Sequence, residues 1–202
     1  MKRQPRADYH HGDLRQACIE QGCVLLREGG KDAVSLREVA RRCGVSVRAP
    51  YQHFADKLTF LAAIAESGFE RFGRALATAQ RKQAQAPVEL RLLALANAYI
   101  DFAQQEPALM QLMFDDTFPE RAERFPTLDR AAVATFDQLR HEVSQLDPLA
   151  SPKEQRQRAA TAWALVHGLA ELIRTEQFGQ VLKGKAATQQ LVTYAVRQFT
   201  RR

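Results

Sequence analysis

The segment Ser35-Leu-Arg-Glu-Val-Ala-Arg-Arg-Cys-Gly-Val-Ser46, which continues as Val47-Arg-Ala-Pro-Tyr-Gln-His-Phe54, decides the fold of the N-terminal part of this chain. Ser35 and Glu38 have the spacing of a capping box, which predicts that a helix begins there. An apolar stripe at positions i, i+3, i+4 and i+7 follows, formed by Leu36, Val39, Ala40 and Cys43. Gly44 suits the left-handed residue that ends a helix, and Ser46 suits the cap of a second helix.

Two short helices joined by a tight turn that contains glycine have the geometry of a helix-turn-helix. In that motif the second helix lies in the major groove of DNA. The second helix predicted here begins at the Ser46 cap and carries several basic and hydrogen-bonding side chains. The segment therefore predicts binding to double-stranded DNA.

The distribution of charge supports an anionic partner for this part of the chain. The net charge of the 202 residues is +6. Residues 1–60 hold 11 Lys and Arg against 7 Asp and Glu, whereas the remaining residues hold 18 against 16. Most of the positive excess thus lies with the predicted helix-turn-helix, as a phosphate-binding surface requires.

Several classes of protein find no support in the sequence. It has no run of about 18 apolar residues and no leader pattern, so we expect no membrane span and a cytoplasmic location. Five scattered histidines without matching ligand spacing predict no metal site, and no cofactor is expected. Cys18, Cys23 and Cys43 fit a reducing compartment. Cys18 and Cys43 are expected to be small core residues, with a redox switch as the alternative.

Helical periodicity extends over nearly the whole chain, and no alternating strand pattern is found, so the predicted fold class is all-α with about nine helices. Besides the helix-turn-helix, the pattern predicts helices over residues 12–28, 57–81, 87–105, 107–114, 127–146, 151–176 and 185–200, with a loop over 115–125. The predicted domains are a flexible basic arm at 1–11, a three-helix DNA-binding domain at 12–58 and a larger helical bundle at 59–202.

Residues 12–61 resemble the tetracycline-repressor (TetR/AcrR) family of bacterial regulators. The residues that carry the match are Leu25-Leu26-x-Glu28-x-Gly30, Ser35-Leu36-x-x-Val39-Ala40, Gly44-Val45-Ser46 and Tyr51-x-His53-Phe54-x-x-Lys57-x-x-Leu61. Pro50 departs from the pattern, because leucine is frequent there in the family. Since proline has no N–H to donate, we expect a slightly re-angled second helix. Further along, Trp163-x-x-x-His167-Gly168-Leu169 is similar to a Trp-His-Gly pattern in one C-terminal variety of the family.

The predicted base contacts come from the second helix. Arg48 is the candidate for direct readout, because a guanidinium can pair with O6 and N7 of guanine. Val47 and Ala49 are small enough to let the backbone approach the DNA, and either side chain could contact a thymine methyl group. Gln52 is expected either to read a base edge or to bind phosphate.

Other residues are predicted to hold the DNA backbone. The resemblance implies a phosphate clamp formed by Tyr51, His53 and Lys57, with the first amides of the following helix adding a favourable dipole. Ser35 and Arg37 are expected to contact the flanking strand. The arm would place Lys2, Arg3 and Arg6 in the minor groove.

The resemblance also implies that the C-terminal bundle holds a small-molecule pocket and a dimer interface. Alanines and Gly168 on the last two helices allow close approach, which predicts a four-helix core between two copies of the chain. Two copies would then bind a pseudo-palindromic operator. The predicted pocket suits an apolar or aromatic effector and is lined by Tyr99, Phe102, Met110, Met113, Phe114, Phe136, Trp163 and His167. The alternatives are plain core packing and a hydrogen-bonded pair of Trp163 with His167 at the dimer seam.

The sequence as a whole predicts a homodimeric transcriptional regulator, acting as a repressor that a small molecule releases from DNA. The alternative within DNA binding is an architectural protein that responds to no ligand. His167 and Glu171 have an i, i+4 spacing that an acid–base or metal pair could use. No third ligand, nucleophile elbow or dinucleotide loop accompanies them, so no enzymatic activity is expected.

Overall fold

The computed structural model describes residues 14–175 and 184–201, and every regular element in these two ranges is helical. The elements are α1 (Leu14–Ala33), α2 (Leu36–Cys43), the short 3-10 helix η1 (Pro50–Gln52), α3 (Lys57–Lys82), α4 (Val88–Gln105), α5 (Pro107–Phe114), α6 (Arg121–Arg124), α7 (Pro126–Ser144), α8 (Pro152–Arg174) and α9 (Gly184–Thr200). The all-α fold class is confirmed. The predicted arm at 1–11 lies outside the described residues.

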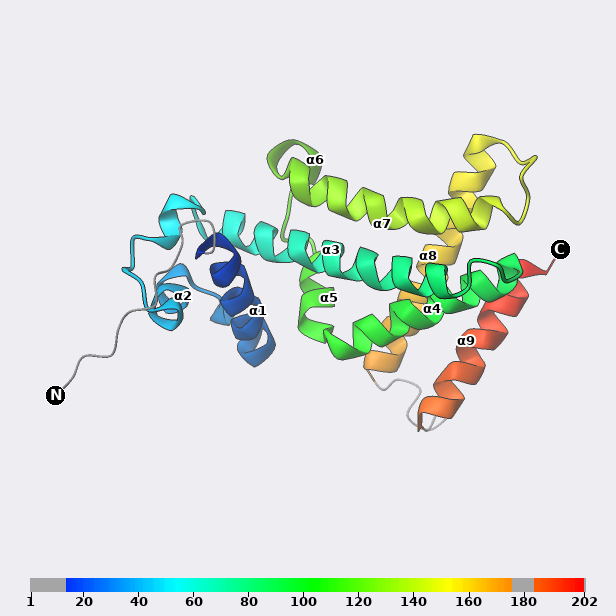
Figure 1. The fold of residues 1–202 in the computed structure, drawn as a ribbon, viewed down its shortest axis with the longest axis horizontal. Coiled ribbons are helices and arrows are strands. Elements are labelled where there is room, and N and C mark those ends of the chain that lie inside the picture. The colour runs from blue at the N-terminus through cyan, green and yellow to red at the C-terminus, as the bar shows by residue number, and fades with distance from the viewer. Residues whose placement is uncertain (1–13, 176–183, 202) are drawn as a thin grey trace.

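Helix α3 links the two ends of the molecule. In Figure 1, α1 and α2 lie at the end nearer the N-terminus, and α3 runs from there along the bundle. Helix α7 packs along one side of α3, and helices α4 and α5 pack along another side of it. Helices α8 and α9 pack against α4. The N-terminal helices and the bundle therefore share one long helix.

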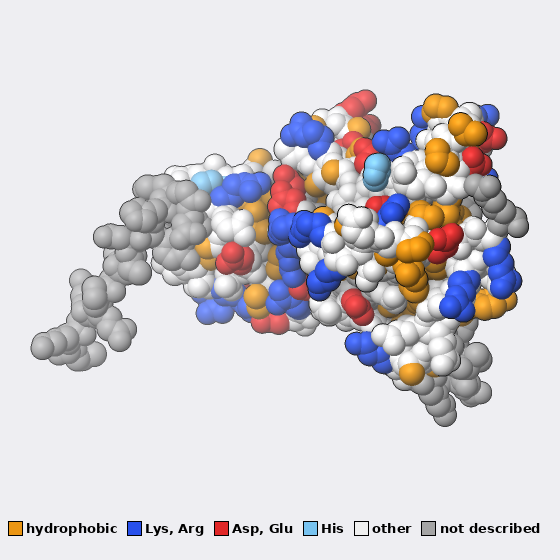
Figure 2. Space-filling model, turned by 45° about the vertical axis from the view of Figure 1, so that its right-hand side comes forward, with side chains coloured by type: hydrophobic (Ala, Val, Ile, Leu, Met, Phe, Trp, Pro, Cys, Tyr) orange, Lys and Arg blue, Asp and Glu red, His pale blue; other side chains and the backbone are white. Residues whose placement is uncertain are grey.

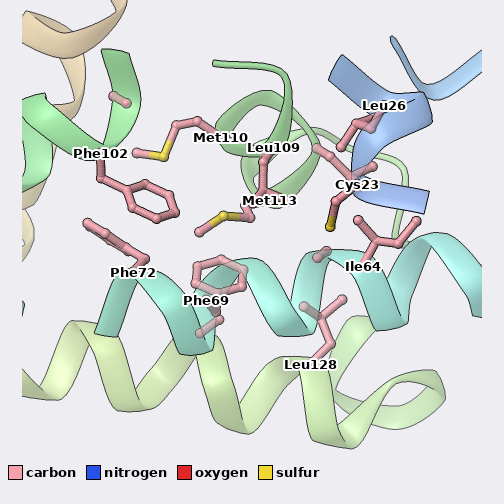
Figure 3. Close-up of a cluster of buried hydrophobic side chains, with 14 of the residues drawn as sticks. Cys23, Leu26, Ile64, Phe69, Phe72, Phe102, Leu109, Met110, Met113 and Leu128 are labelled. Carbon is pink, nitrogen blue, oxygen red and sulfur yellow. The ribbon is translucent and has the colours of Figure 1, made fainter. Parts of the chain in front are cut away.

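The hydrophobic core is continuous from the N-terminal helices into the bundle. Figure 3 shows Cys23 and Leu26 of α1 on one side of α5, with Phe69 of α3 facing that helix from below and Phe72 of α3 beside α4. These four side chains and Met113 of α5 are all buried. Because apolar burial on this scale holds α1, α3 and α5 together, a shift of α5 would be felt by both neighbouring helices.

The predicted starts of α3 and α8 are confirmed by their caps. The Asp56 carboxylate accepts a hydrogen bond from the N–H of Thr59 at 2.7 Å, so α3 begins at Lys57 as expected. Ser151 and Glu154 form a complete capping box at the start of α8.

The regular geometry of the first helix ends where the sequence predicted, because Gly29 and Gly30 have non-helical φ and ψ angles; a short further helical stretch to Ala33 is counted with α1. Gly30 has a φ of 69°, which explains why glycine stands there. The segment predicted as a loop over 115–125 contains the four-residue helix α6, which is too short to leave a periodic signal.

The cysteines occupy packing positions. Cys18 and Cys23 are buried, and all three cysteines are free thiols. Burial, with the neighbouring Cys43 as a smaller cause, raises the pKa of the Cys18 thiol to about 12. Since the thiolate is the reactive form, Cys18 stays protonated and unreactive at neutral pH.

Gly22 permits the close approach of α1 and α3. A Cβ atom at this position would lie 2.5 Å from Cδ1 of Ile64 and 2.7 Å from Cζ of Phe60. Gly22→Ala gains about 1 kcal/mol of helix propensity, but overpacking of a tight core costs about 1–3 kcal/mol. We expect a net loss of about 1 kcal/mol in the free energy of unfolding, measured as a lower urea midpoint. A raised midpoint would contradict this account of the α1–α3 contact.

Candidate nucleic-acid interface and cavities of the bundle

The first half of the predicted helix-turn-helix forms as expected. Ser35 Oγ accepts a hydrogen bond from the N–H of Glu38 at 3.2 Å and caps α2. The capping box is only half formed, however, because the Glu38 carboxylate is hydrogen-bonded to Arg41 and Arg42. These two guanidiniums lower the pKa of Glu38 to about 2. Arg41 and Arg42 are therefore tied to carboxylates of the N-terminal helices.

The turn that follows α2 has the predicted glycine geometry. Gly44 has a φ of 68°, in the left-handed region, and its N–H points to the carbonyls of Ala40 and Arg41. The N–H of Val45 donates to the Ala40 carbonyl at 3.0 Å. This pair of bonds ends α2 and turns the chain sharply.

The second helix of the motif is not an α-helix, which corrects the expectation of a helix that is merely re-angled. Four backbone N–H groups within residues 46–53 donate to the carbonyl three residues earlier: Ala49 to Ser46, Tyr51 to Arg48, Gln52 to Ala49 and His53 to Pro50. Of this stretch, Pro50–Gln52 form the regular 3-10 helix, and the N–H of Phe54 also donates to the Pro50 carbonyl, at 3.0 Å. Pro50 is the physical reason, because it has no N–H for the Ser46 carbonyl. The N–H of Ala49 bonds that carbonyl instead, at 3.0 Å. We call residues 46–53 the recognition segment.

The recognition segment presents most of its side chains to solvent. Val47 is 52% exposed and Tyr51 is 51% exposed, although both are large apolar or aromatic side chains. Ser46, Arg48 and Gln52 are also exposed, whereas Ala49 and His53 are half-buried and Pro50 is buried. Ser46 makes no side-chain capping bond to η1, whose N-cap is Ala49, so the predicted cap at Ser46 is not formed.

The flanking candidates surround this segment. Arg37 is exposed on α2, and Ser35 is half-buried, with its hydroxyl used in the α2 cap. The exposed Lys57 begins α3, and its Nζ donates to the carbonyl oxygen of Asp32 at 3.4 Å. In the described part of the chain, neither Arg37 nor Arg48 forms an ion pair, so both guanidiniums are free for a ligand.

Arg15 is a contact that the sequence reasoning missed. Its guanidinium lies over the ring of Phe54, 5.8 Å from the ring centroid. Phe54 is buried directly after the recognition segment and packs on Phe60 at a centroid distance of 4.7 Å. Arg15 thus connects the first turn of α1 to the end of the recognition segment. No periodic pattern could reveal this pair, because the two residues meet only through the fold.

The residues predicted to line an effector pocket pack mainly against one another. Tyr99 and Trp163 make an edge contact at 5.6 Å between centroids, and Phe114 lies 5.9 Å from Trp163 and 4.9 Å from His167. The ring centroids of Phe136 and Trp163 are 5.7 Å apart. Phe102, Met110 and Met113 are buried in the adjoining core. The structure thus brings the eight residues into one region, most of it densely packed.

His167 is paired with Tyr99 and not with Trp163. The Tyr99 hydroxyl and Nδ1 of His167 are 2.7 Å apart. Burial, together with the charge of Glu171, raises the pKa of Tyr99 and keeps its hydroxyl protonated. The Glu171 carboxylate forms an ion pair with Arg174 at 2.7 Å. His167 and Glu171 are therefore held by separate partners, and the described residues contain no cluster of three potential metal ligands.

Two cavities adjoin this aromatic region. The first, among α3, α4, α7, α8 and α9, is apolar and measures about 50 Å³; Tyr99 and Trp163 line it. The second measures about 460 Å³ and lies between the last turn of α1, α5 and α8. It is lined by Met110, Phe114 and His167 of the predicted set, and by Lys31, Asp115 and Glu171, which were not predicted. Phe102, Met113 and Phe136 line neither of these two cavities.

Charged contacts tie the second cavity to the N-terminal helices. Nζ of Lys31, at the end of α1, lies 2.7 Å from a carboxylate oxygen of Asp115 and 3.1 Å from the Thr117 hydroxyl. The Glu106 carboxylate, just before α5, binds both Arg27 of α1 and Arg71 of α3. Both ends of α5 are thereby fastened to α1.

No helix in the described ranges is long and apolar enough to cross a membrane.

Comparisons with known proteins agree with this architecture. Residues 19–64 match the family model described as bacterial regulatory proteins, tetR family. Residues 92–199, more than half of the chain, match the model described as tetracyclin repressor-like, C-terminal domain. The chain is 27% identical over 187 residues to the HTH-type transcriptional regulator BetI of Cronobacter sakazakii, covering 93% of this chain and 89% of that protein.

Solved structures show the same fold. A protein of unknown function from Rhodococcus sp. RHA1 is 32% identical, with a TM-score of 0.81 and coverage of 97% of this chain and 98% of that one. The TetR family transcriptional regulator PfmR from Thermus thermophilus is 15% identical, with a TM-score of 0.64 and coverage of 91% and 97%. At that identity the second likeness concerns the fold alone.

Proposed function

Because this chain belongs to the tetR family of bacterial regulatory proteins, and is thus a DNA-binding transcriptional regulator and not an enzyme, we propose that it is a homodimeric repressor that a small molecule releases from its operator. The observation that carries the proposal is the exposed recognition segment. Its outer surface offers Val47, Arg48, Tyr51 and Gln52 to a partner, next to the N-terminus of α3. The proposed location is the cytoplasm, where the operator would be found.

The roles proposed for the DNA contacts follow from chemistry and exposure. Arg48 reads a base, since its guanidinium is free and can bond O6 and N7 of guanine. Tyr51 and Lys57 bind phosphate, helped by the positive end of the α3 dipole. The proposed division of labour places DNA binding in residues 12–58, ligand binding and dimerisation in 59–202, and minor-groove contacts in the arm 1–11.

The dimer is proposed to form through α8 and α9. Leu165 and Leu172 lie seven residues apart on α8 and are 38% and 40% exposed, and Tyr194 of α9 is 62% exposed. Gly168 lies between the two leucines, and a Cβ atom there would have no neighbour within 4 Å. An unpaired apolar face with a small residue at its centre suits close packing against the same face of a second copy. Figure 2 shows apolar patches on the surface of the bundle.

The effector is proposed to bind in the cavity between α1, α5 and α8. Its volume of about 460 Å³ lies in the range of small-molecule sites, whereas the apolar cavity of about 50 Å³ does not. A ligand there would contact α1 and α5 directly and could shift the helices that Lys31 and Glu106 hold together. Phe114 and His167 supply the aromatic surface for an apolar or aromatic effector.

A two-stage binding experiment tests the proposal. The palindrome nearest the coding region is footprinted with purified protein, and aromatic and lipophilic compounds are then added to the bound complex. Protection of both half-sites followed by release with a compound supports the proposal. Protection that no compound reverses favours the architectural alternative, and absence of protection at any palindrome excludes the proposed operator.

Lys57→Ala is expected to weaken binding to the operator and to random DNA by the same factor. The reason is that a phosphate contact carries no sequence information but does release counterions. The slope of log K against log salt should therefore become shallower by about one unit. Fluorescence anisotropy titrations on both duplexes at several salt concentrations measure this. A loss confined to the operator would show that Lys57 contacts a base.

A further inference from the structure

The recognition segment differs from an α-helix in a way that changes where its side chains point. A 3-10 helix turns about 120° and rises about 2.0 Å per residue, against about 100° and 1.5 Å for an α-helix. Over the three steps from Arg48 to Tyr51, whose N–H donates to the Arg48 carbonyl, the two geometries differ by about 60° in direction and about 1.5 Å in length. A hydrogen bond from a side chain to one particular base tolerates a much smaller displacement than these differences in direction and length.

Both ends of the segment are fixed by the rest of the domain. At its start, the N–H of Val45 is bonded to the Ala40 carbonyl, so the turn after α2 is anchored. At its end, Phe54 is buried against Phe60, with Arg15 over its outer face. Because both ends are fixed, a change of helix type between them cannot be compensated by a shift of the segment along its axis. It must instead rotate the side chains in between.

Pro50 decides which geometry forms. It is buried, and the carbonyls of Ser46 and Ala49 each accept a bond from the residue three positions later. With an N–H at position 50, the Ser46 carbonyl could accept the i+4 bond of an α-helix. The proline ring also clashes with the carbonyl four residues earlier when that geometry is forced.

We propose that Pro50 is a positioning residue for operator recognition, because the i+3 bonding that it imposes sets which base Arg48 can reach. In this geometry residues i and i+3 eclipse one another, so Arg48 and Tyr51 lie along one edge of the segment. Pro50 itself touches no DNA, because its side chain is buried beneath that edge. The preference for a DNA sequence therefore depends on Pro50, although Pro50 contacts no base.

The test compares the operators chosen by the wild-type protein and by Pro50→Ala from a pool of randomised duplexes. We expect the base preferred by Arg48 to lose roughly tenfold of its advantage, the discrimination carried by one bidentate pair. Affinity for random DNA should change less than affinity for the operator, because the phosphate contact of Lys57 lies outside the recognition segment. The spacing of the half-sites should stay unchanged, because the dimer is not altered. Pro152→Ala, which removes a proline from the first turn of α8, is the matched control and should keep the wild-type preference.

Two further measurements separate positioning from simple packing. The new amide of the Pro50→Ala variant should be protected from hydrogen exchange, since it bonds the Ser46 carbonyl. In an Arg48→Ala background the same proline change should no longer alter the preference at that base, because the two residues act through one contact. A folded Pro50→Ala protein that selects the wild-type operator would overturn the proposal. If that variant unfolds, Pro50→Leu, which fills the buried volume, is judged by the same criteria.

Discussion

A protein carrying Leu165→Glu and Leu172→Glu should be monomeric and should bind the operator at least about 100-fold more weakly than the wild type. Both leucines lie on the exposed apolar face of α8, and a carboxylate at each position would be buried between two copies without a partner. Loss of the dimer leaves one recognition segment for each binding event. The gain from linked binding, about 10²–10⁴ in affinity, then disappears.

Light scattering gives the mass, and a footprint titration gives the affinity of each half-site. Leu149→Glu is the matched control, because Leu149 is 97% exposed in the connection between α7 and α8. It makes the same chemical change outside the proposed interface and should alter neither measurement. A double variant that keeps the dimer mass would place the interface elsewhere, whereas a monomer with wild-type affinity would show that operator binding needs one copy.

The parts of this fold that the sequence predicts well are those fixed by local chemistry. Asp56 and Ser151 cap their helices with their own side chains, and Gly44 adopts the left-handed conformation that its position demands. The apolar face that periodicity predicts for α3 is buried in the structure and includes Ile64 and Phe69. Such signals lie within one or two turns of the chain, so a single sequence contains them.

Other features depend on competition that the sequence does not resolve. The Ser35–Glu38 spacing fits a capping box, but Arg41 and Arg42 compete successfully for the Glu38 carboxylate. Pro50 is visible in the sequence, yet its effect depends on whether the anchored ends let the helix tilt or force it into 3-10 geometry. The cation–π contact of Arg15 requires two segments that only the fold brings together.

The bundle shows the same limit for the effector site. Aromatic and methionine residues at helical spacing have the same pattern whether they line a cavity or fill a core. In the structure Tyr99 and Trp163 pack edge to face, and the larger cavity opens beside Lys31 and Asp115. Those two charged residues lie far apart in the sequence, so their ion pair could not be predicted from spacing.

Arg48→Ala should reduce operator affinity by about 5- to 150-fold, equivalent to about 1–3 kcal/mol, and should relax the preference for one base in each half-site. The Arg48 side chain is exposed on the recognition segment and forms no ion pair with another described residue, so its hydrogen-bond donors are available to DNA. Removing a bidentate contact leaves the guanine acceptors without a partner in the interface. The loss should therefore be large for the operator and small for random DNA.

Arg48→Lys and Arg41→Ala separate the chemistry of this contact from its charge. Lysine keeps the positive charge but lacks the planar fork of a guanidinium, so it should lose part of the discrimination and little of the affinity for random DNA. Arg41→Ala removes the same charge from a side chain that is 72% exposed and bound to Glu38, so it should weaken binding to all sequences by the same small factor. Competition titrations with operators substituted at each base pair measure the three variants. If Arg48→Ala lowers affinity for random DNA as much as for the operator, Arg48 binds phosphate, and base readout must come from Gln52.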